Sequence, residues 1–495
     1  MSLSKLHEFE LQLVEPCLQM LRRGLRVDEA KRREMLGALD AELTPLKERL
    51  NALVAPSLAK ASVDKTRLFA EKWTCQTCRN GKKKRLTCEA CAGQGQRVWL
   101  EYNPSSEKQT KVVLYDLLKL PKRTKGGKLS SDEDDLKGLL AHDTSGVVKA
   151  QLRYKKCQTM RGAFERIAPG EDGRIRTWYN IAGTETGRFS SAETFLERST
   201  NLQNLANKVA AHEPLFDVRR CIVPDEGEVF LYADLSQAEA RIVAALSGDE
   251  RLLEMWSDPS FDIHAWTAAA IFGKDVTNVS AQERFLGKVA RHALNYGMGW
   301  NRFLQNVNAD ADITGVSISA SDAKRIVAAY HHLHPRLEAW WRKVATCLDT
   351  HGHLETVFGR RRTFFGRRET DRWLDHTHKE AIAFEPQATV ADLLNRGLLR
   401  YWRHYDNEGA VSGGSLQEDG PMGNTRHGRL LAQVHDAVLV SVPEEFASRE
   451  ATHLCECLEE EIEVAGTRLT VPCNIEVGRT SWAELESLEE TRAAA

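Results

Sequence analysis

The chain has 495 residues, of which 42% are hydrophobic, so it can build two or more domain-sized cores and is not a wholly disordered protein. Its 68 Lys and Arg residues nearly balance its 70 Asp and Glu residues, which gives a formal net charge of −2. No apolar run approaches the ~20 residues that span a bilayer. Charged residues also interrupt residues 1–20, so neither a membrane protein nor a secreted precursor is expected.

The near-neutral total conceals a polarised distribution of charge. Residues 60–128 contain 17 Lys and Arg residues against 6 Asp and Glu residues, a local net charge of +11. Residues 444–490 contain 3 Arg and 13 Glu residues, a local net charge of −10. Basic segments are typical of proteins that bind polyanions, because neutralised phosphates release counterions. A solvated surface or a loop is the alternative for any single basic run.

Two helices are predicted within residues 5–50, joined near Gly24. Their apolar residues recur at helical spacing, and the first helix would present Leu11, Val14, Leu18 and Leu21. The polar stretch at residues 120–135, which contains Gly and Ser, is predicted to be an exposed loop.

Four cysteines within the basic segment follow the spacing C-x2-C-x9-C-x2-C. Two such pairs can present four thiolates tetrahedrally, which is the arrangement of structural zinc sites. We therefore expect one structural Zn²⁺ ion in an insert at residues 70–100, held by Cys75, Cys78, Cys88 and Cys91. A redox-active or disulfide pair is the alternative. A catalytic zinc is disfavoured, because four cysteines leave no open coordination position.

The stretch "EVFLYADLSQAEARIVAALSGD" combines a short strand with a helix. Val229–Ala233 suits a buried strand, and Asp234 stands where that strand ends. Ser236 and Glu239 have the spacing of a capping box, which predicts that Ser236 caps the following helix. A carboxylate at the end of a central strand is well placed to hold a metal ion. The alternative is that Asp234 only helps to cap the helix.

The stretch "SAQERFLGKVARHALNYGMGW" predicts a helix that begins with a capping box of Ser280 and Glu283. Two cations and then two rings recur every four residues and form one stripe: Arg284, Lys288, His292 and Tyr296. Such a stripe suits a triphosphate at one end and a base or sugar at the other, since Arg and Lys both bind phosphate. A solvated helix face is the alternative.

A second basic cluster, "GRRRTFFGRR" at residues 359–368, carries five Arg and two Phe residues. It is a further candidate for contact with a polyanion. Residues 406–428 have low complexity and are predicted to be a loop.

The stretch "RLLAQVHDAVLVSVP" contains two β-rich runs, Leu430–Val434 and Val438–Val442. The two runs can pair as a hairpin that carries Asp436 at its tip. Two strand-borne aspartates brought together can bind a pair of Mg²⁺ ions, which stabilise both the attacking and the leaving oxygen of a phosphoryl displacement. The alternative for His435 and Asp436 is an ordinary tight turn.

Together these stretches resemble the polymerase region of family A DNA polymerases, the bacterial DNA polymerase I family and its phage relatives. "ADLSQAEARI", "RFLGKVARHALNYG" and "QVHDA" are similar to the family's motifs A, B and C. "TETGRFSSAE", followed by "NLQN", resembles the stretch that touches the duplex minor groove. The resemblance covers nearly the whole chain apart from the zinc insert, residues 406–428 and the last dozen residues.

The resemblance implies an α+β fold shaped as a right hand, with an antiparallel sheet in the palm and mostly helical fingers and thumb. The implied divisions are a thumb region with the N-terminal helices at residues 1–153, which contains the zinc insert at 70–100, a first palm segment at 154–240, fingers at 241–355 and a second palm segment at 356–495.

It also implies a template-directed DNA polymerase, a nucleotidyltransferase of DNA replication that extends a primer 3′-hydroxyl with dNTPs. Asp234 and Asp436 would be the catalytic carboxylates that hold two Mg²⁺ ions, and Lys288 would also act in catalysis. The implied dNTP-binding residues are Arg284, Lys288, His264, Glu239, Gln237, His292 and Tyr296, of which Glu239 would exclude ribonucleotides. The implied DNA-binding residues are Arg188, Asn204, Gln387 and His435.

Several positions depart from the family pattern. His292 stands where relatives commonly carry Phe or Tyr, and Ala437 replaces the carboxylate that usually follows the motif C aspartate. Leu235 replaces a common Tyr, and Lys379 replaces a usual Arg. The thumb-like helices begin within ten residues of Met1. That leaves no room for the 3′–5′ exonuclease that family members often carry, so we expect no proofreading.

The expected partners are primer–template DNA and dNTPs, without a membrane, in the cytoplasm of a bacterial or phage-infected cell. The zinc insert would grip DNA, dock a separate exonuclease, helicase or primase, or form a stapled loop without a partner. Two other functions stay open: a single-subunit RNA polymerase-like enzyme, and a non-catalytic DNA-binding scaffold of the replisome. Glu239 favours DNA synthesis, and the retention of Asp234 and Asp436 argues against a scaffold.

Overall fold

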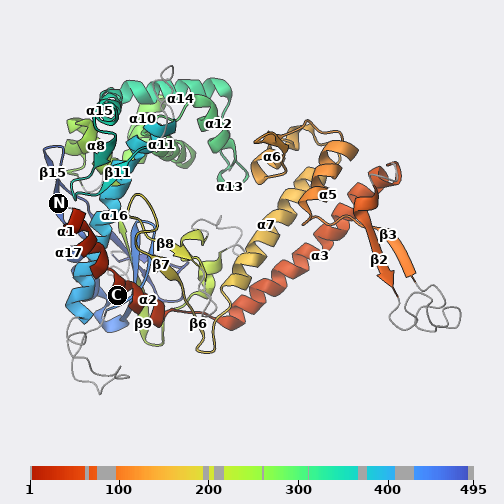
Figure 1. The fold of residues 1–495 in the computed structure, drawn as a ribbon, viewed down its shortest axis with the longest axis horizontal. Helices are drawn as coiled ribbons and strands as arrows, with labels where there is room; N and C mark the ends of the chain where they lie inside the picture. The colour runs from red at the N-terminus through yellow and green to blue at the C-terminus, as the bar shows by residue number, and fades with distance from the viewer. Residues whose placement is uncertain are drawn as a thin grey trace. The chain divides into compact units, whose positions relative to one another are not determined.

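The computed structural model describes residues 3–61, 66–74, 96–192, 200–205, 217–258, 261–309, 311–365, 376–406 and 428–488 (Figure 1). The chain divides into two compact units. One consists of Met1–Glu29 and Arg166–Ala495, and the other of Ala30–Glu165. The described residues combine many helices with short antiparallel strands, which confirms the predicted α+β class. None of the described helices combines the length and the apolar character that crossing a bilayer requires.

A five-stranded antiparallel sheet lies at the centre of the larger unit. Its order is β12 (Arg429–Val434), β13 (Ala437–Pro443), β9 (Glu228–Leu235), β16 (Cys473–Gly478) and β17 (Glu486–Ser487). β12 and β13 form the predicted hairpin, with Val434 opposite Ala437. Strand β9 is the middle strand, and its residues from Val229 to Leu231 are buried, as are those from Ala437 to Val442 of β13. This continuous apolar character is typical of strands covered on both faces.

Helices cover this sheet and extend beyond it. α17 (Ala447–Leu458) packs on strands β9, β13 and β16, and the long helix α16 (His376–Asp406) packs against α17 and α8 (Figure 1). A group of helices follows strand β9 along the chain, within which α10, α11 and α14 contact one another. Its members are α8 (Ala238–Ser247), α9 (Glu250–Met255), α10 (Ile263–Phe272), α11 (Ala281–Leu294), α12 (Trp300–Ala309), α13 (Ala311–Thr314), α14 (Ala320–Leu333) and α15 (Arg336–His351).

The described part of this unit also contains four two-stranded ribbons. They pair β1 (Leu25–Arg26) with β6 (Arg174–Ile175), β7 (Trp178–Asn180) with β8 (Ser190–Ala192), β10 (His353–Glu355) with β11 (Arg361–Thr363), and β14 (Glu461–Val464) with β15 (Thr467–Thr470).

The N-terminal helices differ from the prediction. The first predicted helix is two helices, α1 (Leu3–Gln12) and α2 (Val14–Arg23), and the next is α3 (Glu29–Ala59). Gly24 ends α2 with a φ of +63°, as its predicted role as a joint requires. The predicted apolar face is wrong, because Leu11 and Val14 are exposed. The face that joins the main core instead carries Leu13, Cys17 and Met20.

The smaller unit is built on two long helices, α3 and α7 (Val147–Arg166), which lie side by side (Figure 1). Ion pairs join them, from Arg153 to Glu42 and from Arg161 to Asp40. Short elements complete the unit: β2 (Ala70–Thr74), β3 (Gln96–Leu100), α5 (Glu107–Lys111), the π-helical turn Val112–Leu117, β4 (Thr124–Lys125), β5 (Lys128–Leu129) and α6 (Glu133–Lys137). The stretch predicted as a loop at 120–135 therefore contains a small hairpin and the start of a helix.

The predicted zinc ligands Cys75, Cys78, Cys88 and Cys91 lie outside the described residues, as does nearly all of the predicted loop at 406–428. The strands that flank the cysteines are described. β2 and β3 pair antiparallel, with Thr74 opposite Gln96. The two described residues on either side of the cysteine-bearing segment are therefore neighbours in space.

Candidate active site

A cavity of about 380 Å³ lies at the end of strand β9. It gathers most of the residues that the sequence singled out, namely Asp234, Gln237, Glu239, His264, Arg284, Lys288, His292, Tyr296 and Asp436. Three further polar residues of the lining were not predicted: Arg291, Asn295 and Asn474. The cavity therefore joins the strand–helix segment, the cationic helix and the hairpin tip, which are far apart in the sequence.

The two aspartates are placed by the sheet itself. Asp234 is the next-to-last residue of β9, opposite Ala437 of β13 and Asn474 of β16. Asp436 stands in the two-residue turn between β12 and β13, where His435 takes the left-handed φ of +54°. The backbone N–H of Leu235 donates to the carbonyl oxygen of Asp436 at 3.3 Å, which ties this turn to the end of β9.

Both aspartates are largely removed from water, and this burial is the main cause of their shifted pKa values. Burial raises the pKa of the Asp234 carboxyl to about 7, and the charges of Asp436 and Glu476 act in the same direction, while Lys288 opposes them. Burial also raises the pKa of Asp436, although Arg188 partly offsets this effect. Ionised carboxylates in such a place are stabilised by a cation beside them.

The donor set fits a hard divalent cation. Mg²⁺ prefers oxygen ligands and commonly takes one or two protein carboxylates together with substrate phosphates and water. Among the described residues, no group of three or more His, Cys, Asp or Glu side chains is arranged for a metal ion. Asp234 and Asp436 are the two carboxylates that such an ion would take in this cavity.

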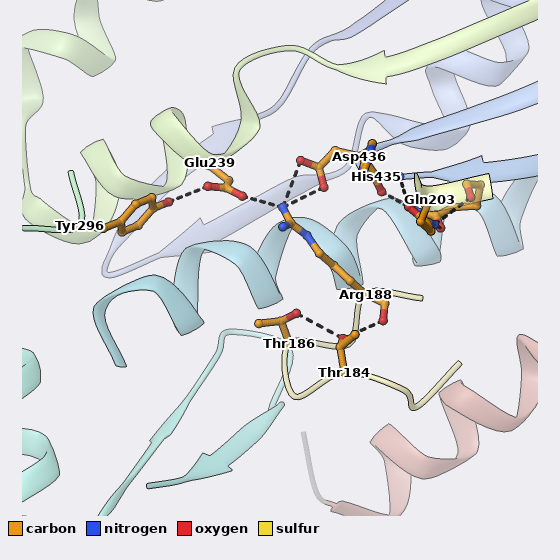
Figure 2. A network of polar contacts seen from close by, with 9 residues as sticks. Thr184, Thr186, Arg188, Gln203, Glu239, Tyr296, His435 and Asp436 are labelled. Carbon is orange, nitrogen blue, oxygen red and sulfur yellow. Dashed lines mark hydrogen bonds and ion pairs between the residues drawn. The ribbon is translucent and has the colours of Figure 1, made fainter. Parts of the chain in front are cut away.

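A chain of polar contacts links the cavity to the hairpin tip (Figure 2). The Arg188 guanidinium donates through Nη2 to both carboxylate oxygens of Asp436, at 3.0 and 3.2 Å, and to Glu239 Oε1 at 2.6 Å. The Tyr296 hydroxyl donates to the other oxygen of Glu239 at 2.7 Å. One arginine thus neutralises two carboxylates. The resemblance suggested each of these residues, but no local pattern predicts that they meet.

The loop between β7 and β8 fixes the backbone of Arg188. The Thr184 hydroxyl donates to the Arg188 carbonyl oxygen at 2.7 Å, and the Asn395 side-chain amide donates to the Gly187 carbonyl oxygen at 3.2 Å. Gly187 has a φ of +76°, and a Cβ there would lie 2.4 Å from the Arg360 guanidinium. Only glycine therefore fits between this turn and the buried Arg360.

The start of helix α8 contradicts one prediction. The helix begins at Ala238, and its N-cap residue is Gln237, which has a φ of +54° and makes no side-chain cap. Ser236 does not cap the helix: it lies in the turn directly after β9, and its N–H donates to the carbonyl oxygen of Pro472 at 2.8 Å. The Glu239 carboxylate is therefore free of the capping box and turns to Arg188 and Tyr296.

The cationic helix α11 forms one wall of the cavity. Its predicted capping box of Ser280 and Glu283 is confirmed. Tyr296 lies two residues beyond the last helical residue, Leu294, so the predicted stripe extends past the end of the helix. Helix α10 packs closely, since a Cβ on Gly287 would lie 2.3 Å from the His264 carbonyl oxygen.

His264 faces the same wall, with its ring centroid 6.0 Å from that of His292. Burial lowers the pKa of His264 to about 3, and His292 and Lys288 contribute in the same direction. Its Nδ1 is buried and has no hydrogen-bond partner among the described residues. Near neutral pH this ring is uncharged and can offer hydrogen bonds to a ligand.

The remaining predicted residues lie outside the cavity lining. His435 is exposed on the hairpin turn, and Gln387 is half-buried on α16. The Asn204 side chain lies outside the described residues, and its neighbour Gln203 makes the contacts instead. Gln203 accepts from the His435 N–H at 2.8 Å and donates to the Gln433 carbonyl oxygen at 3.1 Å. Sequence reasoning missed Gln203, although it lies in the same "NLQN" stretch.

The chain is similar to known bacterial DNA polymerases. The thermostable DNA polymerase I of Thermus filiformis is 29% identical over 393 residues, which is 77% of this chain and 42% of that protein. The DNA polymerase I of Pseudomonas aeruginosa is 29% identical over 393 residues, which is 78% of this chain and 38% of that protein. The chain thus spans about two-fifths of the length of these relatives.

Among solved structures, the fold resembles the POL domain of Pol1 from M. smegmatis, a complex with DNA primer-template and dNTP. The TM-score is 0.72 at 21% identity, over 96% of this chain and 70% of that one. A model of DNA polymerase family A matches residues 79–484, which is well over half of the chain. The chain therefore belongs to DNA polymerase family A.

Proposed function

We propose that the chain is a DNA-directed DNA polymerase that extends a primer 3′-hydroxyl with dNTPs on a DNA template. The observation that carries this proposal is the meeting of Asp234 and Asp436 with the cations Arg284 and Lys288 in one cavity. Phosphoryl transfer needs positioning and charge stabilisation more than covalent catalysis. Two carboxylates that can hold metal ions and a cationic helix that can hold a triphosphate supply both needs.

The parts of a polymerase hand can be assigned to the two units. The five-stranded sheet, within residues 154–240 and 356–495, would form the palm, and the helices within 241–355 would form the fingers. The thumb would lie within residues 1–153. This assignment is supported by the family match and by the position of the two aspartates in the sheet.

The proposed metal ligands are Asp234 and Asp436, which would hold two Mg²⁺ ions. When bound, such ions stabilise charge on the attacking and leaving oxygens. The chain's own residues have separate tasks. Arg284, Lys288 and the neutral ring of His264 would hold the triphosphate, and Lys288 would also neutralise charge that develops during transfer. The sugar and base would meet Gln237, Glu239, His292 and Tyr296.

The proposed DNA contacts lie beside the hairpin tip. Arg188, His435 and Gln387 would face the primer–template, together with Asn204 and its neighbour Gln203. Minor-groove acceptors are shared by all base pairs, so donors placed there can test the shape of a pair without reading sequence. The polar cluster of Gln203 and His435 supports this assignment, because it holds the turn next to Asp436 in a fixed position.

Two further features belong to this proposal. We infer one structural Zn²⁺ ion at Cys75, Cys78, Cys88 and Cys91, which is supported by their spacing and by the pairing of the flanking strands. We also infer that this chain has no proofreading activity, because a polymerase-domain fold accounts for 96% of it.

Primer extension tests the proposed function directly. With Mg²⁺ and dNTPs, the purified chain should extend a primer annealed to a longer template, and rNTPs should support extension far more weakly. An RNA polymerase-like enzyme would show the reverse preference. A replisome scaffold would bind the DNA and leave the primer at its original length. A primer with a mismatched 3′ end should stay undegraded, and its shortening would contradict the absence of proofreading.

Glu239 is expected to set the preference for dNTPs. Glu239→Ala should raise the efficiency of rNTP incorporation relative to dNTP incorporation on the order of 100-fold, because removing a side chain that crowds the 2′ position opens space for a hydroxyl. The measurement is kcat/KM for a matched dNTP and rNTP pair. Tyr296→Phe is the matched control, since it breaks the 2.7 Å contact to Glu239 and keeps the carboxylate. An equal gain in the control would place the preference in Tyr296 instead.

A further inference from the structure

Arg188 occupies the place of a cation at the proposed metal site. Its Nη2 lies 3.0 and 3.2 Å from the two carboxylate oxygens of Asp436 (Figure 2). These are the atoms with which Asp436 would hold a metal ion. The side chains are only 30% and 27% exposed, so solvent screens this pair weakly. The same carboxylate cannot serve both partners fully at once.

The Arg188 side chain is held at two points, and its backbone is fixed independently. The first point is Asp436. The second is Glu239 Oε1, at 2.6 Å, and the Tyr296 hydroxyl donates to the other carboxylate oxygen of Glu239 at 2.7 Å. The Thr184 hydroxyl and the Gly187 turn anchor the main chain. A change of partner would therefore need only rotation of the Arg188 side chain, without movement of the loop.

Arg188 also has an unused donor. Its Nε is buried and has no hydrogen-bond partner among the described residues. Leaving a buried donor unpaired is costly, so this contact geometry does not satisfy the guanidinium. An acceptor presented near the hairpin tip would satisfy the guanidinium better. The minor-groove edge of every base pair carries such acceptors, N3 or O2.

We propose that Arg188 competes with the catalytic metal ion for Asp436, and that binding of the primer end releases Asp436 by drawing Arg188 away. In the DNA-free protein Arg188 pairs with the Asp436 carboxylate and so weakens metal binding there. With a primer end in place, Arg188 turns to the base pair, and Asp436 becomes available. Metal binding and primer binding are then coupled through one side chain, and the coupling is reciprocal. This inference rests on the proposed function, but it concerns affinity and not turnover.

Mn²⁺ binding to the DNA-free full-length chain tests the competition without measuring catalysis. Free Mn²⁺ is quantified by electron paramagnetic resonance during titration. Arg188→Gln should bind Mn²⁺ about 10-fold more tightly than the unmodified chain, within the usual range of coupling between sites. Arg188→Lys keeps the charge and should stay near the unmodified value. Asp436→Asn should lose this site, which identifies it.

Arg284→Gln is the matched control for charge alone. Arg284 lines the same cavity and pairs with Asp262, and within the described residues it makes no hydrogen bond or ion pair with Asp436. If removing any positive charge from the cavity tightened Mn²⁺ binding, Arg284→Gln would tighten it as much as Arg188→Gln. That result would overturn the proposal. Circular dichroism checks that each variant is folded.

A duplex with a dideoxy-terminated primer completes the test. Adding it should tighten Mn²⁺ binding at the Asp436-dependent site of the unmodified chain by about the same 10-fold factor. It should add little to Arg188→Gln, where Asp436 is already free. Asp436→Asn with the same duplex corrects for Mn²⁺ on the DNA phosphates. If Arg188→Gln and the unmodified chain bind Mn²⁺ with equal affinity, the competition is refuted. If the unmodified chain also extends primers, the polymerase proposal stays intact.

Discussion

Replacing Asp436 with asparagine should lower the rate of primer extension on the order of 1,000-fold or more. The carboxylate lies at the hairpin tip, next to Asp234 across the β9–β13 pairing, and it faces the cavity. Losing a carboxylate that holds a metal ion removes several kcal/mol of transition-state stabilisation, and each 1.36 kcal/mol corresponds to a tenfold change in rate. Asp234→Asn should have a comparable effect. Single-turnover extension of a primer by one dNTP measures this change.

Glu476→Gln provides the matched control. Glu476 stands on β16 opposite Tyr232, raises the pKa of Asp234 through its charge, and does not line the cavity. The same chemical change there should alter the rate by less than about tenfold, because it acts only through weak electrostatics at distance. Retention of more than a tenth of the normal rate in Asp436→Asn would contradict a catalytic role for this carboxylate.

The secondary structure around the site could be predicted because its signals are local. The hairpin at Asp436 follows from two β-rich runs separated by a turn, and the capping box at Ser280 follows from spacing alone. The same reasoning failed at Ser236, where the identical spacing with Glu239 predicts a cap that does not form. There Ser236 lies in a turn and its N–H donates to Pro472, and Glu239 contacts Arg188 and Tyr296. A tertiary contact overrides a local preference in this case.

The contacts that complete the site could not be predicted from local patterns. Arg188 and Asp436 are 248 positions apart, and Gln203 and Gln433 are 230 positions apart. Only the fold brings these pairs together. The apolar face of α2 was also misjudged, because several faces of that short helix carry apolar residues. Which face is buried depends on the sheet and ribbon that it meets, β12 and β7.

Arg360, the first arginine of the second basic cluster, is buried in ion pairs and is not available for the expected polyanion contact. Arg360 is 8% exposed and lies in a network of buried ion pairs. Its guanidinium contacts both oxygens of Asp392 at 2.7 to 3.1 Å and Glu10 at 2.8 Å. Arg362 pairs with Glu185 and Glu380. Arg367 and Arg368 lie outside the described residues.

Asp392→Asn should therefore lower the free energy of unfolding by about 3 kcal/mol or more, since removing one partner of a buried ion pair leaves the other charge uncompensated. Asp392 is 1% exposed at its side chain. Burial raises its pKa, and Arg360 opposes this shift, so the charged form depends on the arginine. Urea unfolding followed by tryptophan fluorescence measures the loss. Glu338→Gln breaks an exposed pair with Arg342 and should change stability by no more than about 0.5 kcal/mol.

The double variant Arg360→Met and Asp392→Leu separates the ion pair from packing. Apolar residues of similar volume can replace a buried pair at little cost, so the double variant should recover much of the stability that Asp392→Asn loses, less the cost of removing the Arg360 contact from Glu10. In the double variant, the free energy of unfolding and the rate of primer extension should then respond differently. Arg360 packs against Gly187, next to Arg188, so a double variant with restored stability should still position that arginine poorly and extend primers more slowly. If the double variant is as unstable as Asp392→Asn, packing at this position matters more than charge. If it extends primers normally, Arg360 supports the fold and has no part in placing Arg188.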